Sequence, residues 1–316
     1  MEDIFDKKIA IIGSGAIAMS LAALFTGNGF GTSILTRGQK STVRGKNRYK
    51  KNFETLVGKN LVTPKQAKES EKRLQYVDNF EGLQNADIIF ECVIEDIEVK
   101  GSIFKQVESY CSNLTAIVST TSALSVEDLA KNLTIYKNKI VIAHPFNPPH
   151  LVPFIELVKG DTTEQQSIEV TRNLLEYCGR EVVTMRKSAP GFIANRLQHA
   201  LLREAIHLVE KGYATPKDVD KALKFSFMPR YTSVGLFEHQ DAAGLDMVMN
   251  IHNYLFPSLC DIKEAQEYIT SRCNMGHFGQ KTGEGVYSWS EEDIEDFRAR
   301  AAEPYWKYFN WKIPND

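Results

Sequence analysis

The sequence predicts an α/β protein in which a doubly wound parallel sheet comes first and an all-helical domain follows. Short, continuous apolar runs alternate with helical segments over the first 188 residues, as expected for strands buried on both faces. The first of these runs leads straight into a glycine-rich turn and a helix. From Pro190 onward the pattern becomes helical. We therefore predict two domains, covering residues 1–188 and 189–316.

The predicted elements follow one another in a regular order. Apolar runs predict strands at 9–12, 32–35, 86–93, 116–119, 139–143, 154–158 and 181–183. Helices are expected after the glycine turn, from about Lys100, from Ser125 with its capping pattern, and over 192–211, 215–224 and 246–255. The polar, charge-mixed segment 46–73 is interpreted as two surface helices.

The glycine-rich turn has the sequence Gly13-Ser14-Gly15-Ala16-Ile17-Ala18. Between a buried strand and a helix, this spacing is the fingerprint of a Rossmann-type dinucleotide site. Gly13 permits the tight turn, Gly15 lets the backbone approach a pyrophosphate, and Ala18 packs the helix against the strand. Glycine turns also occur without a ligand, but the flanking strand and helix favour a nucleotide site here.

The end of the second strand bears on which nucleotide is bound. NAD-binding units carry an acidic residue about 20 residues beyond the glycines, where it binds the ribose 2′-OH. Here the position is Thr36, and Arg37 follows it. Because the planar arginine fork binds phosphate in a bidentate way, the pair favours NADP(H) over NAD(H). The basic residues further along are interpreted as a solvated helix face.

Composition and charge exclude several other classes. The 316 residues are 43% hydrophobic and carry a formal charge of −2, which gives no reason to expect a nucleic-acid or membrane partner. No apolar run approaches the roughly 18 residues that span a bilayer, and the acidic N-terminus lacks a secretory pattern. The five cysteines are scattered without CxxC spacing, so neither disulfides nor a thiolate metal site is expected. We expect a soluble protein of a reducing compartment, most simply the cytoplasm.

Two polar side chains stand at the ends of predicted strands, where ligands bind in such sheets. These are Ser122 and His144, and Glu156 follows His144 by twelve residues. If the intervening loop folds over, the carboxylate can fix the imidazole tautomer and raise its basicity, so that the free nitrogen accepts a proton from an alcohol. A purely structural histidine remains the alternative. A metal pair with His150 is disfavoured by the prolines between the two and by the lack of a third ligand, so no metal is predicted.

The chain resembles the 3-hydroxyacyl-CoA dehydrogenase family in several stretches: IIGSGAIA, IFECVIEDIEVK, STTSALS, HPFNPPHLVPFIELV, APGFIANRL and GHFGQKTGEGVYSW. They occur in family order over nearly the whole chain, and HPFNPP with the following glutamate, together with GFIANR, is highly specific. The resemblance implies hydride transfer between a 3-hydroxy group and nicotinamide. It implies that His144 is the general acid/base and that Glu156 orients it.

The resemblance also assigns the side chains around the reacting groups. It implies that Ser122 and Asn195 hold the substrate oxygen, which suits an electrophilic carbonyl. The implied cofactor contacts, some of which also face the substrate, are Glu95, Lys100, Ser122, Asn147 and Lys281. It further implies a homodimer formed through the helical domain.

Departures from the family pattern bear on the substrate. The segments Pro148-Pro149-His150-Leu151-Val152-Pro153 and Met228-Pro229-Arg230-Tyr231 resemble the branch that acts on free hydroxy acids, L-gulonate 3-dehydrogenase (lambda-crystallin) and carnitine 3-dehydrogenase. There Arg230 is suited to clamp a carboxylate. The alternative is a surface pair of Arg230 with Glu238 or Asp241.

The sequence is also compatible with other functions. A CoA thioester substrate, as in a 3-hydroxybutyryl-CoA dehydrogenase, is supported by Lys59 at about the position of the family's CoA-binding lysine, although the expected serine is Asn52. A cofactor-binding or structural protein without chemistry is a further alternative. A β-hydroxyacid dehydrogenase with a catalytic lysine is disfavoured because the matching position is Asn195.

Overall fold

A computed structural model describes residues 4–314, which fold as two compact units. The first unit contains the chain up to Ile193 together with the residues from Ala301 on. The second unit is the intervening stretch, Ala194–Arg300.

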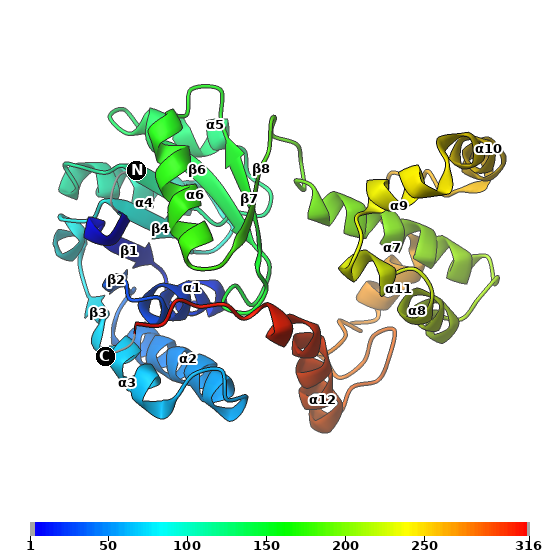
Figure 1. Ribbon diagram of the computed structural model, residues 1–316, viewed down its shortest axis with the longest axis horizontal. Helices are drawn as coiled ribbons and strands as arrows, with labels where there is room; N and C mark the ends of the chain where they lie inside the picture. Colours follow the sequence, from blue (N-terminus) through cyan, green and yellow to red (C-terminus); the bar gives the residue numbers. More distant parts are fainter. Residues whose placement is uncertain (1–3, 315–316) are drawn as a thin grey trace. The chain divides into compact units, whose positions relative to one another are not determined.

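One sheet of eight strands forms the centre of the first unit, in the order β3-β2-β1-β4-β5-β6-β7-β8 (Figure 1). Its strands are β1 (Ile9–Ile12), β2 (Thr32–Leu35), β3 (Leu74–Val77), β4 (Ile88–Glu91), β5 (Ala116–Ser119), β6 (Ile140–Pro145), β7 (Phe154–Lys159) and β8 (Glu181–Thr184). The first six strands have the order of doubly wound dinucleotide-binding sheets, which confirms the predicted fold class. Neighbours are parallel except β6 and β7, which are antiparallel.

Helices cover both faces of this sheet. They are α1 (Ala16–Gly27), α2 (Gln39–Gly58), α3 (Pro64–Lys72), α4 (Ile97–Tyr110), α5 (Val126–Ala130) and α6 (Gln165–Tyr177). Alternate side chains of β1 enter opposite layers, as the period of a strand requires. Ile9 and Ile11 pack with α1, α2 and α6, whereas Ala10 and Ile12 pack with α4 and α5.

The C-terminal segment corrects the predicted second domain, which ran to residue 316. After α12 (Glu291–Ala302) the chain returns to the first unit, and Figure 1 shows this segment in red running along α1. The buried Trp311 ring packs on Phe53, with ring centroids 6.0 Å apart. The backbone N–H of Lys312 donates to Asn28 Oδ1 at 2.6 Å. Burial of an aromatic ring against α1 and α2 explains why this segment leaves the helical unit.

The close fit of Trp311 on α1 gives a stability prediction. A Cβ added at Gly27 would lie 2.3 Å from the Trp311 ring. We expect Gly27→Ala to destabilise the protein by about 1–3 kcal/mol, because overpacking forces the ring or the helix to shift. Gly58→Ala is the matched control, since Gly58 also ends a helix but has open space around it. Urea denaturation compares the two, and equal stabilities would contradict this packing.

The second unit is built from helices and loops. Its helices are α7 (Ala194–Glu210), α8 (Pro216–Phe225), α9 (Leu236–Ala243), α10 (Leu245–Leu255) and α11 (Glu267–Asn274), and α12 begins within it. Among the described residues of α7 to α11 none is buried. Several large apolar side chains are strongly exposed, including Phe237 at 88% and Tyr254 at 87%. Over residues 4–314, no helix has the length and apolarity to cross a bilayer.

Candidate active site

The glycine turn after β1 is built for close approach. Gly13 has a φ of +129°, a region that favours glycine, and a Cβ there would lie 2.5 Å from the Cys92 carbonyl oxygen. Gly13 N–H donates to the Leu35 carbonyl at 3.0 Å, so the turn is tied to the end of β2. Gly15 caps α1 and has nothing within 4 Å of a built Cβ. This open space before a helix N-terminus fits a nucleotide pyrophosphate.

Neighbouring groups fix the turn further. Arg48 of α2 donates from Nη1 to the Ser14 carbonyl at 3.0 Å. Ala18 is fully buried in the core between α1 and the sheet, where a larger side chain would separate them. The small third residue of the motif therefore has a packing role here.

His144 and Glu156 are directly opposite each other in the antiparallel pair β6–β7. The His144 Nδ1 atom lies 2.9 Å from Glu156 Oε2, and the exposed fractions of the two residues are 5% and 0%. Because an ionised carboxylate only accepts hydrogen bonds, Nδ1 carries the proton and Nε2 has the free lone pair. The second oxygen, Oε1, accepts from the Ile193 N–H at 2.7 Å. The arrangement can hold one imidazole tautomer in a fixed orientation.

Aromatic rings pack against the His144 imidazole. The centroids of the Phe146 and Phe192 rings each lie 5.3 Å from it. The sequence predicted a helix from Phe192, but α7 begins at Ala194 and Phe192 has a φ of +52°. This left-handed conformation, unusual for a bulky residue, coincides with burial of its ring beside the histidine. Sequence periodicity could not reveal it.

The loop between β6 and β7 is anchored from two sides. Its buried His150 has Nδ1 3.0 Å from Ser20 Oγ in α1, and burial lowers the pKa of His150 to about 4, helped by the nearby charge of Arg180. Arg180 donates from Nη1 to the Pro149 and Val152 carbonyls at 3.1 and 3.2 Å. His150 is therefore a buried, neutral packing residue.

Glu95 organises the turn after β5. Its Oε1 accepts from the Thr121 hydroxyl and, at 3.1 Å, from the Ser122 N–H, while Oε2 lies 3.4 Å from Lys100 Nζ. Partial burial alone would raise the pKa of Glu95, but the Thr121 hydrogen bond and the Lys100 charge outweigh it and lower that pKa. The Ser122 side chain is exposed at this edge.

Glu91, the last residue of β4, was not singled out from the sequence. Both of its oxygens lie 2.8 Å from Lys100 Nζ, and Oε2 accepts from the Ser119 hydroxyl at 2.6 Å. Glu91 and Lys100 are 0% and 1% exposed. Lys100 was predicted to contact the cofactor, but the structure buries its ammonium group between Glu91 and Glu95. A lone acid inside the apolar run IIFEC was the available signal, since buried charges need partners.

Three further predicted residues lie on the first unit. Thr36 directly follows β2 and is buried, with its hydroxyl 2.6 Å from that of Thr42. Arg37 is exposed beside it. Asn147 is exposed on the loop after β6. Arg37 and Asn147 therefore remain accessible to a ligand.

Lys59, at the position predicted for a CoA-binding lysine, contacts other residues of this protein. Lys59 Nζ lies 3.5 Å from Glu303 Oε2 and 5.4 Å from the centre of the Trp306 ring. Asn52 donates from Nδ2 to the Met19 carbonyl at 3.3 Å. Both side chains thus contact the protein itself, and Lys59 contacts the returning C-terminal segment.

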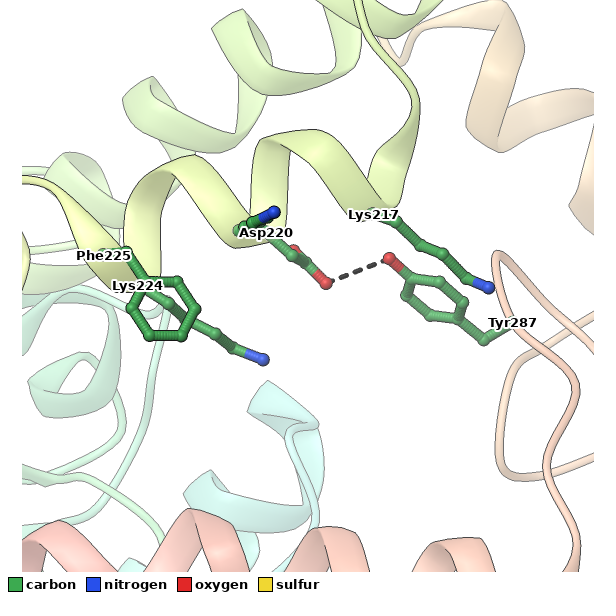
Figure 2. A pocket seen from close by; sticks show the side chains of 6 residues that line it. Lys217, Asp220, Lys224, Phe225 and Tyr287 are labelled. Atoms are coloured by element: carbon green, nitrogen blue, oxygen red, sulfur yellow. Dashed lines mark hydrogen bonds between the residues drawn. The ribbon is translucent and has the colours of Figure 1, made fainter.

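The remaining predicted residues lie on the second unit. Asn195 is half-buried in the first turn of α7, two residues after Ile193, and Lys281 is exposed in a loop. Figure 2 shows a pocket of this unit between α8 and Tyr287, whose hydroxyl donates to Asp220 Oδ2 at 2.9 Å. Exposed lysines line it, and it contains none of the predicted site residues.

Arg230 forms neither predicted surface pair. It lies in the short helix Arg230–Thr232 and donates from Nη1 to His239 Nε2 at 2.7 Å. Within residues 4–314 it has no ion pair with Glu238 or Asp241. A guanidinium group that donates to an imidazole nitrogen, and has no carboxylate partner among the described residues, keeps its charge available for an anion.

The sheet order, the glycine turn and the histidine–carboxylate pair define a dinucleotide-dependent oxidoreductase. Comparison with known families agrees. The family model of the 3-hydroxyacyl-CoA dehydrogenase NAD binding domain matches residues 8–188, and that of the C-terminal domain matches residues 191–289. The chain belongs to the 3-hydroxyacyl-CoA dehydrogenase family.

Individual relatives span most of the chain. It is 26% identical to 5-formyl-3-hydroxy-2-methylpyridine 4-carboxylate 5-dehydrogenase of Mesorhizobium japonicum, over 94% of this chain and 95% of the relative. It is 31% identical to L-carnitine dehydrogenase of Oceanobacillus iheyensis, over 75% and 76%. A crystal structure described as 5-formyl-3-hydroxy-2-methylpyridine 4-carboxylic acid 5-dehydrogenase, an NAD⁺-dependent dismutase, superposes with a TM-score of 0.86 at 26% identity, covering 95% of this chain and 96% of that one.

Proposed function

We propose that the protein interconverts a 3-hydroxy and a 3-oxo group on a small hydroxy acid, with NAD(P) as the hydride carrier. The observation that carries this is the 2.9 Å contact between His144 and Glu156, on a sheet edge whose glycine turn fits a dinucleotide. His144 Nε2 takes the hydroxyl proton in the oxidation and returns it in the reduction. A nicotinamide cofactor held at the glycine turn 13–18 would supply the hydride acceptor for the oxidation and the hydride donor for the reduction.

We assign the groups around the substrate as follows. Ser122, and Asn195 beyond Ile193, hold the substrate oxygen, so that charge developing on it meets hydrogen-bond donors. Asn147 lies at the nicotinamide end and contacts cofactor and substrate. Glu95 contacts the nicotinamide ribose and positions Ser122, while Lys281 contacts the cofactor from the second unit.

Lys100 keeps a role in this proposal, but an indirect one. Its buried ammonium holds Glu95 at 3.4 Å, so it acts on the cofactor site through that carboxylate. We therefore treat Lys100 as a positioning residue.

The proposed substrate is a free hydroxy acid rather than a CoA thioester. Lys59 pairs with Glu303, whereas Arg230 has no carboxylate partner within residues 4–314 and can bind a substrate carboxylate. The similarity to L-carnitine dehydrogenase agrees with this choice. Turnover of free 3-hydroxy acids and of 3-hydroxybutyryl-CoA, followed by absorbance of the reduced nicotinamide, tests it. Faster turnover of the thioester would contradict the proposed substrate class. Cofactor binding without turnover of any substrate would indicate a cofactor-binding protein without dehydrogenase activity.

The proposed cofactor is NADP(H) in preference to NAD(H). Thr36 stands where NAD-binding units carry an acidic residue, and its hydroxyl lies 2.6 Å from that of Thr42. Arg37 follows it and is exposed. We expect Arg37→Asp to shift the ratio of kcat/KM values from NADP⁺ toward NAD⁺ by at least about tenfold, because a carboxylate accepts from a ribose 2′-OH and repels a 2′-phosphate. Initial rates with both cofactors give the ratio, and an unchanged ratio would defeat the assignment.

We further propose a homodimer formed through the second unit, in a reducing compartment such as the cytoplasm. The dimer is supported by the large apolar side chains Phe225, Phe237 and Tyr254, each at least 80% exposed, because association would bury them. All five cysteines are free, which suits a reducing compartment. Sedimentation measures the oligomeric state directly.

A further inference from the structure

The first turns of α2 border a pocket of about 460 Å³. It is lined by Gln39, Lys40, Val43 and Arg44. Lys40 and Arg44 are four residues apart, so they project from the same face of the helix. The pocket therefore carries two cations beside an apolar side chain, in the part of the chain that directly follows β2 and Arg37.

No carboxylate in the described part of the chain neutralises these cations. Within residues 4–314, none of Arg37, Lys40 and Arg44 forms an ion pair. Among the described residues, the Arg44 side chain donates to Ser41 Oγ over a long distance of 3.4 Å from Nη2. The sequence contains no acidic residue from Thr36 to Phe53. The pocket is thus a concentration of positive charge that is suited to an anion.

The pocket also lies on the adenosine side of the proposed nucleotide site. The glycine turn is tied to the last residue of β2 by the hydrogen bond from Gly13 to Leu35. In doubly wound sheets the residues after this strand face the adenosine ribose. Gly38, between Arg37 and α2, has nothing within 4 Å of a built Cβ, so a ligand has room to reach Lys40.

We propose that Lys40 and Arg44, together with Arg37, form a subsite for the 2′-phosphate of NADP(H). Arg44 supplies a planar fork for the phosphate oxygens and Lys40 a point charge, which are complementary ways of binding phosphate. This inference rests on the proposed nucleotide site, but not on hydride transfer by His144.

Calorimetric titration with 2′,5′-ADP and with 5′-AMP tests the subsite without any turnover. We expect the wild-type protein to bind 2′,5′-ADP at least about tenfold more tightly, since charged hydrogen bonds to the 2′-phosphate are added. The double variant Lys40→Ala/Arg44→Ala should lose this preference and keep its affinity for 5′-AMP. Lys51→Ala, an exposed cation further along α2, is the control and should behave as wild type.

Three binding results would contradict the subsite. Equal wild-type affinity for the two nucleotides would show that the 2′-phosphate is not recognised. A preference that survives in the double variant would place the phosphate elsewhere. Failure of both nucleotides to bind the wild-type protein would also contradict the proposed nucleotide site, whereas tight binding without turnover would leave the subsite standing and contradict only the dehydrogenase activity.

Discussion

Replacing His144 with glutamine is expected to lower kcat by about 10²–10⁴-fold, the usual contribution of a general acid/base. Glutamine fills a similar volume between Phe146 and Phe192 but cannot take the hydroxyl proton at neutral pH. The glycine turn is built from other strands, so cofactor affinity should change little. Stopped-flow or steady-state rates measure the first effect, and fluorescence titration with the reduced cofactor measures the second.

Glu156→Gln separates the role of the carboxylate from that of the ring. The amide can present an N–H group to Nδ1, which favours the tautomer with the proton on Nε2 and removes the base. We expect a loss of kcat comparable to that of His144→Gln, with the pH dependence of the remaining activity flattened. Retention of most activity in either variant, at unchanged cofactor affinity, would refute the proposed acid/base pair.

The His144–Glu156 pair also shows how far the sequence could predict the site. The two residue types and their separation suggested a contact, but spacing alone does not give the register of a hairpin. The structure shows that β7 is antiparallel to β6, which places the two residues at directly opposed positions. Parallel strands with apolar runs were predictable because burial on both faces leaves a strong local pattern.

Elements with a weak local pattern escaped prediction. The four residues of β3 lie at the sheet edge and are only partly buried, so they lack a continuous apolar run. The C-terminal segment was assigned to the helical domain because its sequence does not show which distant residues Trp311 packs against. Lys100 was expected to contact the cofactor from the family resemblance, and its burial in α4 depends on Glu91 at the end of β4, a pairing that local sequence does not reveal.

The second large effect is expected on the free energy of unfolding, when the buried Glu91–Lys100 pair is broken. Glu91→Gln should destabilise the protein by about 3–5 kcal/mol, because removing one partner leaves a buried ammonium without its counter-ion. Glu95 offers little compensation, as its side chain is 42% exposed and lies 3.4 Å from Lys100 Nζ. Urea denaturation of the full-length protein, followed by circular dichroism, measures the change in the free energy of unfolding.

Two companion variants identify the cause of this loss. Glu54→Gln removes a carboxylate from an exposed pair with Lys50 and should change stability by less than about 1 kcal/mol. The double variant Glu91→Leu/Lys100→Met removes both buried charges and should recover much of the lost stability, because apolar residues of similar volume often replace a buried ion pair without penalty. If the double variant were less stable than Glu91→Gln, the hydrogen bond from Ser119 and the local backbone, rather than an uncompensated charge, would account for the effect.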